Sequence, residues 1–527
     1  MTAAVVQGPR PSRGNRVEFL IDNEAAWGRL AEDIASARTS LRCMLFMLDL
    51  PHVRLGFAED PAGRPGAPGS VRMEEALLAA ARRGVEVDVL LNDVRPGWSP
   101  ANTSRAVERY FARHDGTGRI RLRRFTTPQA APIHAKLFII DDALAYSIGS
   151  IFAQEYFDGP AHAVDDPRRG HLRWRSSVLA PNHDVSARVT GPATADLDAV
   201  FRLHWDHCGP DDRTERKPDD RTGTIPVQVT RTLHGGRFAA LPQGETGVHE
   251  SYRTALAEAE EFVYLENQYL TSTAIVDELV AALRRSRDLQ VIALLNSRPD
   301  IPGYPRWQAE ALERLWTGVR RAGAANRVGV YTAWSHEGRS IIRTHIHSKV
   351  AIVDDRWLTV GSANLDGLST LASDHRRRAS LPVRWLGRVS GVFGPEAPEL
   401  VRATEVNLSI ADFDGGDGAA VRHLASGLRR RLWAEHLGLD DAELVRPEGG
   451  WAALWRERAE LKLRGLREAP GEPVASRILP FPHEGTRVPL GLERPEAYLR
   501  ALGLGTEGLD VRRRLRSFRF DTGAWKP

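Results

Sequence analysis

Cysteine, lysine and long hydrophobic runs are all scarce in this sequence. Cys43 and Cys208 are the only cysteines among 527 residues, so neither a disulfide framework nor a cysteine-based zinc site is expected. No apolar stretch approaches the length that crosses a membrane, and we expect any membrane contact to be peripheral. Residues 1–16 are polar and lack the apolar segment of a secretory signal, which favours a cytoplasmic location.

The scarcity of lysine draws attention to a repeated motif. Only five lysines occur, because arginine is used for almost every other cation. Two of the five lie in copies of the pattern His-x-Lys-x-x-x-x-Asp. The copies consist of His134, Lys136 and Asp141, and of His347, Lys349 and Asp354.

Each copy contains a short, β-branched apolar run that is typical of a buried strand. Side chains two apart on a strand share a face, so the histidine and lysine of one copy can contact one ligand. The aspartate is seven residues from the histidine, roughly 23 Å along a strand at about 3.3 Å per residue. We therefore expect it to fix a strand end. A single copy would favour an ordinary histidine beside a buried strand, whereas two copies make that interpretation weak.

The duplicated motif, with Gly361, Ser362 and Asn364 after the second copy, resembles the phospholipase D superfamily of phosphodiesterases. The resemblance covers roughly residues 17–440. It implies an α/β fold of two similar phospholipase D-like α/β/α lobes, related by pseudo-two-fold symmetry and sharing one active site. Three segments resemble phospholipase D itself more than the superfamily's nucleases: residues 183–192, 265–269 and 432–438.

The order of expected elements supports an internal duplication. Helices at residues 73–84 and 275–285 precede strands at 85–92 and 289–295, and both strands carry Leu-Leu-Asn. We predict a disordered N-terminus (1–16), an N-terminal lobe (17–208), a linker (209–225), a C-terminal lobe (226–440) and a C-terminal extension (441–527).

The resemblance also implies a mechanism that needs no metal or other cofactor. His134 is the expected nucleophile and His347 the expected general acid, with a phosphohistidine intermediate that water or an alcohol resolves. The two lysines neutralise the phosphoryl oxygens. As members of the motifs, the two aspartates are included with the histidines and lysines in the catalytic set that the resemblance implies. Asp184 matches the acidic partner downstream of the first motif, and Glu405 that of the second.

The first copy departs from the family pattern. Ile151, or Phe152 if one residue is inserted, stands where the second copy has Asn364. An amide is therefore missing on one side. We expect an asymmetric site in which Ser362 and Asn364 supply polar groups from the second copy alone.

These observations favour a monomeric phospholipase D, a hydrolase of phosphoric diester bonds that acts on a glycerophospholipid at a membrane surface. It would release phosphatidic acid or transfer the phosphatidyl group to an alcohol. A nuclease is an alternative, but no basic stripe with interleaved aromatics marks nucleic-acid binding. A cardiolipin synthase would normally add N-terminal membrane helices. An inactive scaffold that binds phosphoanions is the remaining alternative, and the retention of both His–Lys pairs argues against it.

Overall fold

The computed structural model describes residues 3–57, 70–95, 103–128, 131–170, 180–210, 222–301, 303–371, 402–489 and 491–513. Within these ranges helices and strands alternate along the chain, as the sequence predicts for an α/β protein. Most of the predicted linker, residues 209–225, falls outside the described residues. No helix within these ranges combines the length and the apolar character needed to cross a bilayer.

The strands of the first half form a mixed sheet in the order β6-β5-β2-β7-β8-β10-β1. β2, β5 and β6 are parallel, and the remaining neighbours are antiparallel. The bounds are β1 Ser12–Ile21, β2 Ser40–Leu45, β5 Glu86–Arg95, β6 Ile120–Pro128, β7 Leu137–Ile140, β8 Leu144–Ser147 and β10 Val185–Thr190.

The second half repeats this arrangement in the order β15-β14-β13-β18-β19-β20-β11, with the same parallel and antiparallel pairs. Both halves thus have the topology that two similar lobes require. The bounds are β11 Ile225–Leu233, β13 Phe262–Asn267, β14 Gln290–Leu295, β15 Val328–Glu337, β18 Lys349–Val353, β19 Trp357–Gly361 and β20 Glu405–Ala411.

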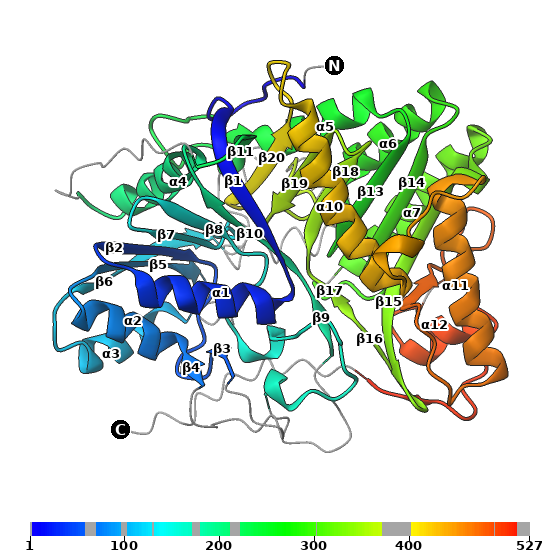
Figure 1. Cartoon of the computed structure of the whole chain (residues 1–527), viewed down its shortest axis with the longest axis horizontal. Helices are drawn as coiled ribbons and strands as arrows, with labels where there is room; N and C mark the ends of the chain where they lie inside the picture. Colours follow the sequence, from blue (N-terminus) through cyan, green and yellow to red (C-terminus); the bar gives the residue numbers. More distant parts are fainter. Residues whose placement is uncertain are drawn as a thin grey trace.

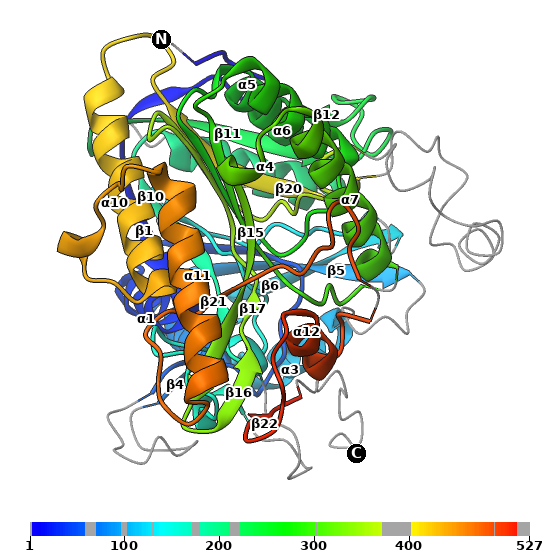
Figure 2. The same cartoon turned by 90° about the vertical axis from the view of Figure 1, so that its right-hand side faces the viewer.

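The two sheets meet where β1 pairs with β11, and the halves lie side by side in Figure 1, whereas the second half faces the viewer in Figure 2. β1 begins at Ser12, so the prediction of disorder is wrong for residues 12–16. The reason is that these polar residues gain backbone partners from both halves: Ser12 lies opposite Val227, and Arg16 lies opposite Thr190.

The helices repeat in the same order and cover both faces of the sheets. Regular apolar spacing explains their placement: in α6, Ile275, Val276, Leu279 and Leu283 are buried along one side. The bounds are α1 Asp22–Ser36, α2 Met73–Arg82, α3 Ser104–His114 and α4 Ala193–His207 in the first half, and α5 Gly247–Glu258, α6 Thr273–Arg285, α7 Tyr304–Arg321 and α10 Gly418–Leu437 in the second.

One hydrophobic core is shared by the halves. It combines side chains of α4 and α10 with residues from the strands of both sheets. Two further cores lie under α1, α2 and α3 in the first half and under α5, α6 and α7 in the second. The shared core fixes the two halves relative to each other, and this is what a site built from both requires.

The predicted C-terminal extension packs on the second half. α11 (Gly450–Glu468) contacts β14 and β15, and β21 (Ile478–Pro480) extends the sheet beside β15. The remaining elements are short: β3 Arg54–Gly56, β4 Val71–Arg72, β9 Asn182–His183, β12 Glu245–Thr246, β16 Ser340–Arg343, β17 His345–Ile346, β22 Asp510–Val511, α12 Pro495–Ala501, and the 3-10 turns η1 Gln154–Tyr156, η2 Pro167–Arg169, η3 Ala325–Arg327 and η5 Asp441–Glu443.

Candidate active site

Each motif copy is held by backbone hydrogen bonds from the opposite half. The N–H groups of His134 and Ala135 both donate to the carbonyl of Thr404 at 2.9 Å. In the same way, the N–H of His347 donates to the carbonyl of His183 at 2.8 Å, where β17 and β9 run parallel. The segment before β20 thus pairs with the first motif, and the segment before β10 pairs with the second. This crossed pairing brings the two motifs together.

An asparagine from within each half completes this support. The amide of Asn92 donates to the carbonyl of Ile133 and accepts from its N–H, both at 2.8 Å. Asn296 does the same for Ile346, at 2.7 and 2.8 Å. These asparagines end the Leu-Leu-Asn phrases that the sequence repeats. They are buried and fix the residue before each motif histidine.

Each imidazole is oriented by a carboxylate from the other half. His134 Nδ1 lies 2.9 and 3.0 Å from the two oxygens of Glu405, and His347 Nδ1 lies 2.8 Å from Asp184 Oδ2. The expectation that Asp184 would serve the first motif and Glu405 the second is therefore wrong. Each acid lies just after a backbone segment that pairs with the opposite half, and it therefore contacts the histidine of that half. Donation from Nδ1–H to a carboxylate leaves Nε2 of both rings for chemistry.

Both lysines are fully buried, and they are close enough to influence each other's charge. Burial and Lys349 lower the pKa of Lys136 to about 7, and burial lowers the pKa of Lys349 to about 8. Lys349 Nζ donates to Gln268 Oε1 at 3.1 Å and to the carbonyl of His347. Lys136 Nζ has no hydrogen-bond partner among the described residues. A buried ammonium without a partner is suited to an anionic ligand.

The two carboxylates have different environments. Burial raises the pKa of Glu405, but His134, Lys136 and the hydroxyl of Ser362 outweigh it and hold that pKa below its usual value. Ser369 donates a second hydroxyl to Glu405 at 2.6 Å. Burial instead raises the pKa of Asp184 to about 6, although Lys349 opposes the shift. Burial and Lys136 lower the pKa of His134 despite Glu405, which favours a neutral ring.

Asp141 and Asp354 do not join this group. Asp141 accepts hydrogen bonds from the N–H groups of Arg38, Thr39 and Ser40, at the start of β2. Asp354 accepts them from residues 260–262 at the start of β13, at 2.7–2.9 Å. The interpretation that these aspartates fix strand ends accounts for the geometry. We therefore withdraw their assignment as catalytic residues.

The expected asymmetry is visible around the two acids. Ser362 donates to Glu405, and Asn364 is buried with its Oδ1 unpaired among the described residues. In the first copy Ser150 turns away and donates to Asn23 at 2.9 Å, while Ile151 packs in the core. Gly149 lies so close to Asp184 that an added Cβ would sit 1.9 Å from its Oδ1.

A buried polar network behind the motifs was not assigned from the sequence. Glu266 accepts hydrogen bonds from Ser348, from Tyr264 at 2.7 Å and from His436 at 3.0 Å, and its carboxylate lies 2.8 Å from His183 Nε2. The sequence did contain a signal, because Glu266 and His436 lie in two of the segments that resemble phospholipase D.

A pocket opens beside the second motif. It has a volume of about 730 Å³, and its lining includes Asn296, His345, Arg298, Arg343 and Asp300. His345 is two residues before His347, and their rings lie 5.7 Å apart. Neither this pocket nor a larger hollow near Asp141 is lined by a motif histidine or lysine. The pocket is the nearer of the two to the second motif in sequence, through His345.

Comparison with known proteins finds relatives that cover most of this chain. Residues 252–375 match the family model described as cardiolipin synthase, PLD-like domain. Phospholipase D A of Dictyostelium discoideum is 25% identical over 444 residues, which cover 71% of this chain and 32% of that protein. The chain thus spans about a third of that relative.

Cardiolipin synthase B of Salmonella typhi is 24% identical over 371 residues, covering 68% of this chain and 74% of that enzyme. Among solved structures, the phosphatidylserine synthase of Haemophilus influenzae superposes with a TM-score of 0.45 at 10% identity, covering 79% of this chain and 86% of that one. The family model and the curated relatives, which include both phospholipases D and cardiolipin synthases, support the phospholipase D superfamily for this chain.

Proposed function

We propose that this protein is a phospholipase D-type phosphodiesterase that works through a phosphohistidine. One observation carries the proposal: two imidazoles, each oriented by a carboxylate of the opposite half, share a buried site with two lysines. Because both motif copies belong to one chain, a monomer contains the complete site. Similarity to the superfamily supports phosphodiester cleavage or transfer at the coarser level.

The reaction divides into two displacements. His134 Nε2 attacks phosphorus while the leaving oxygen takes the proton from His347 Nε2, which gives phosphohistidine and the free headgroup alcohol. His347, now neutral, then removes a proton from water or an alcohol as its oxygen attacks the same phosphorus. His134 leaves, and the product is phosphatidic acid or a phosphatidyl alcohol. Lys136 and Lys349 donate to the non-bridging oxygens in both steps.

Two properties favour His134 as the nucleophile. Its side chain is 17% exposed, compared with 4% for His347, so substrate phosphorus reaches it more easily. Phosphorylation at Nε2 also leaves a cationic ring whose Nδ1–H faces Glu405. The hydroxyls of Ser362 and Ser369 hold that carboxylate in its anionic form.

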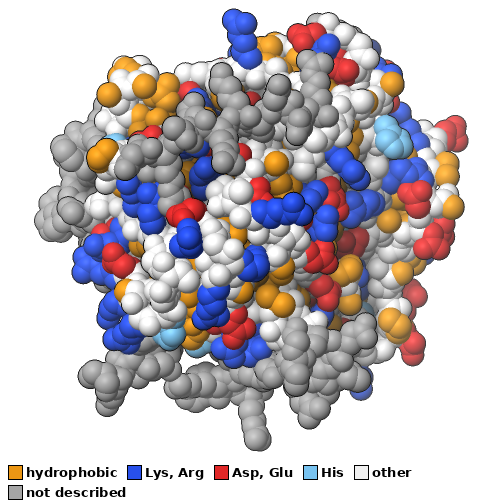
Figure 3. Space-filling view, turned by 60° about the vertical axis from the view of Figure 1, so that its left-hand side comes forward, with side chains coloured by type: hydrophobic (Ala, Val, Ile, Leu, Met, Phe, Trp, Pro, Cys, Tyr) orange, Lys and Arg blue, Asp and Glu red, His pale blue; other side chains and the backbone are white. Residues whose placement is uncertain are grey.

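A glycerophospholipid is the proposed substrate. Both classes of relative, phospholipase D and cardiolipin synthase, are named for phospholipid chemistry. A nuclease would need a continuous basic groove, whereas on the described face in Figure 3 arginines and carboxylates are interspersed. The lipid would be taken from a membrane surface by peripheral contact.

The test is a substrate screen of purified protein by mass spectrometry. Vesicles of phosphatidylcholine, phosphatidylethanolamine or phosphatidylglycerol and single-stranded DNA are each supplied with and without ethanol. We expect phosphatidic acid without ethanol and phosphatidylethanol with it, and neither product from His134→Ala. Brief addition of EDTA should leave the initial rate unchanged, because lysines stabilise the charge. Cardiolipin formed from phosphatidylglycerol would redirect the proposal to a synthase, and cleavage of DNA alone would refute it.

A further inference from the structure

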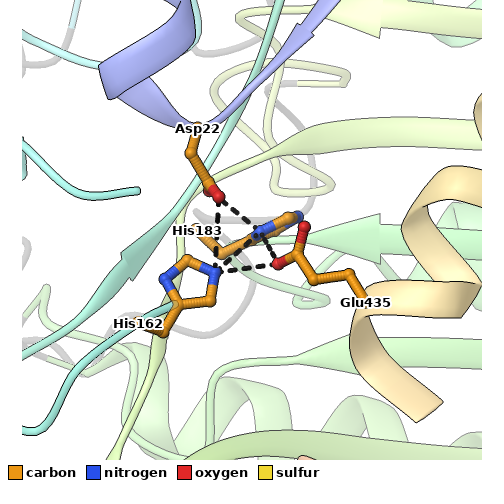
Figure 4. Close-up of side chains that lie close together, drawn as sticks. All are labelled: Asp22, His162, His183 and Glu435. Atoms are coloured by element: carbon orange, nitrogen blue, oxygen red, sulfur yellow. Dashed lines mark hydrogen bonds and ion pairs between the residues drawn. The ribbon is translucent and has the colours of Figure 1, made fainter. Parts of the chain in front are cut away.

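A second buried cluster of titratable side chains, drawn in Figure 4, adjoins Asp184 through the backbone of Asp22 and His183. It consists of Asp22 at the start of α1, His162 between η1 and η2, His183 in β9 and Glu435 in α10. No side chain in the cluster is more than 11% exposed. The first three come from the N-terminal half and Glu435 from the C-terminal half, and the catalytic steps above use none of them.

The donor atoms of this cluster converge on one point. His162 Nε2 faces His183 Nδ1 at 3.3 Å, and Glu435 Oε1 lies 2.9 Å from the first and 3.0 Å from the second. Oxygens of Asp22 lie 3.1 Å from His183 Nδ1 and 3.6 Å from His162 Nε2. Four ligands at 2.0–2.1 Å around a tetrahedral ion stand about 3.3 Å apart, which is the middle of this range.

The other ring nitrogens face outer carboxylates, as those of metal-binding histidines usually do. His183 Nε2 lies 2.8 Å from Glu266, and His162 Nδ1 lies 3.1 Å from Asp158. A second observation points to a missing ligand: among the described residues Asp22 Oδ2 is fully buried and accepts no hydrogen bond. Asp22 also adopts φ of 63°, a conformation that non-glycine residues keep only when their surroundings enforce it.

We propose that Asp22, His162, His183 and Glu435 bind one four-coordinate divalent transition-metal ion of the zinc type. Two neutral imidazoles and two carboxylates offer the mixed nitrogen and oxygen donors that zinc accepts, and their charges balance a dication. Magnesium and calcium would instead demand six or more oxygen ligands. All four positions are filled by protein, so the site is structural and leaves no place for a reacting water.

The ion would clamp the two halves together next to the catalytic centre. It ties α10 of the second half to three segments of the first. The N–H of Asp22 donates to the carbonyl of Asp184 at 2.8 Å, and His183 directly precedes Asp184. The ion thus makes these residues positioning residues for the carboxylate that orients His347. It takes no part in the transfer of the phosphoryl group.

The alternative to a bound metal ion is protonation of both imidazoles in the cluster. Burial lowers the pKa of His162, but Asp22 and Asp158 outweigh it and raise that pKa to about 9. Metal content separates the two alternatives. Full-length protein, purified without chelator, is measured by plasma mass spectrometry, and protein stripped with dipicolinate is titrated with Zn²⁺ or Co²⁺. We expect about one ion per chain, a raised thermal midpoint, and the visible bands of tetrahedral cobalt.

Two variants and a control locate the ion. His162→Gln and Glu435→Gln should each lower the metal content at least tenfold, whereas His204→Gln should not. His204 is equally buried but bonds the hydroxyl of Thr404 away from the cluster. The proposal is refuted if wild-type protein contains less than a tenth of an equivalent of metal as purified and binds less than that in the titration. It is also refuted if both variants retain the metal. If a variant fails to fold, the wild-type titration still decides. These measurements decide the proposal without an assay of phosphodiesterase activity.

Discussion

The exchange of carboxylates between the halves gives a prediction that separates the two histidines. Glu405→Gln removes the acceptor that orients His134, the proposed nucleophile, and Asp184→Asn removes the acceptor that orients His347, the proposed acid. Both substitutions keep the size of the side chain. In the structure Glu405, which lies downstream of the second motif, contacts His134 of the first, so Glu405→Gln should impair His134 and not His347.

The magnitude follows from the contacts of Glu405. An amide facing Nδ1 presents its NH₂ group or a weaker acceptor, so the proton of His134 moves to Nε2 and blocks attack. Removing the orienting carboxylate of a catalytic histidine costs about 10³–10⁴ in kcat, or about 4–5.5 kcal/mol. Asp184→Asn impairs a general acid, which is worth about 10²–10⁴.

Two substrates and one trapping experiment distinguish these losses. With a choline ester both variants should be slow. With a p-nitrophenyl ester, whose departure needs little proton donation, Asp184→Asn should recover at least tenfold and Glu405→Gln should not. A denaturing quench at alkaline pH, which preserves the acid-labile P–N bond, should trap phosphohistidine in Asp184→Asn alone. The reverse pattern would refute the pairing. Glu245→Gln, also buried but paired with Arg231, is the matched control and should keep wild-type kcat.

Three further outcomes follow from the same geometry. His347→Ala should lose turnover of natural esters yet still accumulate a phosphoryl group on His134 with the p-nitrophenyl ester. Peptide mapping locates that group, and its presence on another residue would contradict the assignment. Asp354→Asn should lower the free energy of unfolding by about 1–3 kcal/mol in a denaturant titration and leave kcat near wild type, because its three N–H bonds are structural. The pH profile of kcat/KM should fall below about pH 6, where Asp184 gains a proton, and again above about pH 7, where Lys136 loses one; a flat profile from pH 5 to 9 contradicts both shifts.

Much of the fold was predictable because its signals are local. The predicted helix at residues 275–285 is confirmed as α6, and the strand at 85–92 is confirmed within β5. Both follow from apolar spacing over a few residues. β1 was not predicted as a strand, and its first residues, Ser-Arg-Gly-Asn, are polar. Their stability comes from pairing with β11, more than 200 residues later in the chain.

The histidines and lysines of the site could be identified from the sequence, whereas the hydrogen-bond partner of each histidine could not. The scarcity of lysine singled out Lys136 and Lys349, and the repeated spacing implied one shared site. The partner of each histidine depends on which segments pair across the halves, and no local pattern encodes that. Glu266 was missed for the same reason, since its histidine partners His183 and His436 come from different halves of the chain.

The departure of the first motif from the family pattern gives the two histidines different surroundings in this structure. A perfectly symmetric site would give both imidazoles the same environment, so neither would be favoured as nucleophile or as acid. Here Glu405 receives two hydroxyls and remains anionic, while Asp184 lies against Gly149, receives neither hydroxyl, and has a pKa of about 6. The turn of Ser150 toward Asn23 is what leaves Asp184 without a hydroxyl. We therefore infer that the asymmetry of the two copies assigns the two roles, and that the missing amide is part of a working site.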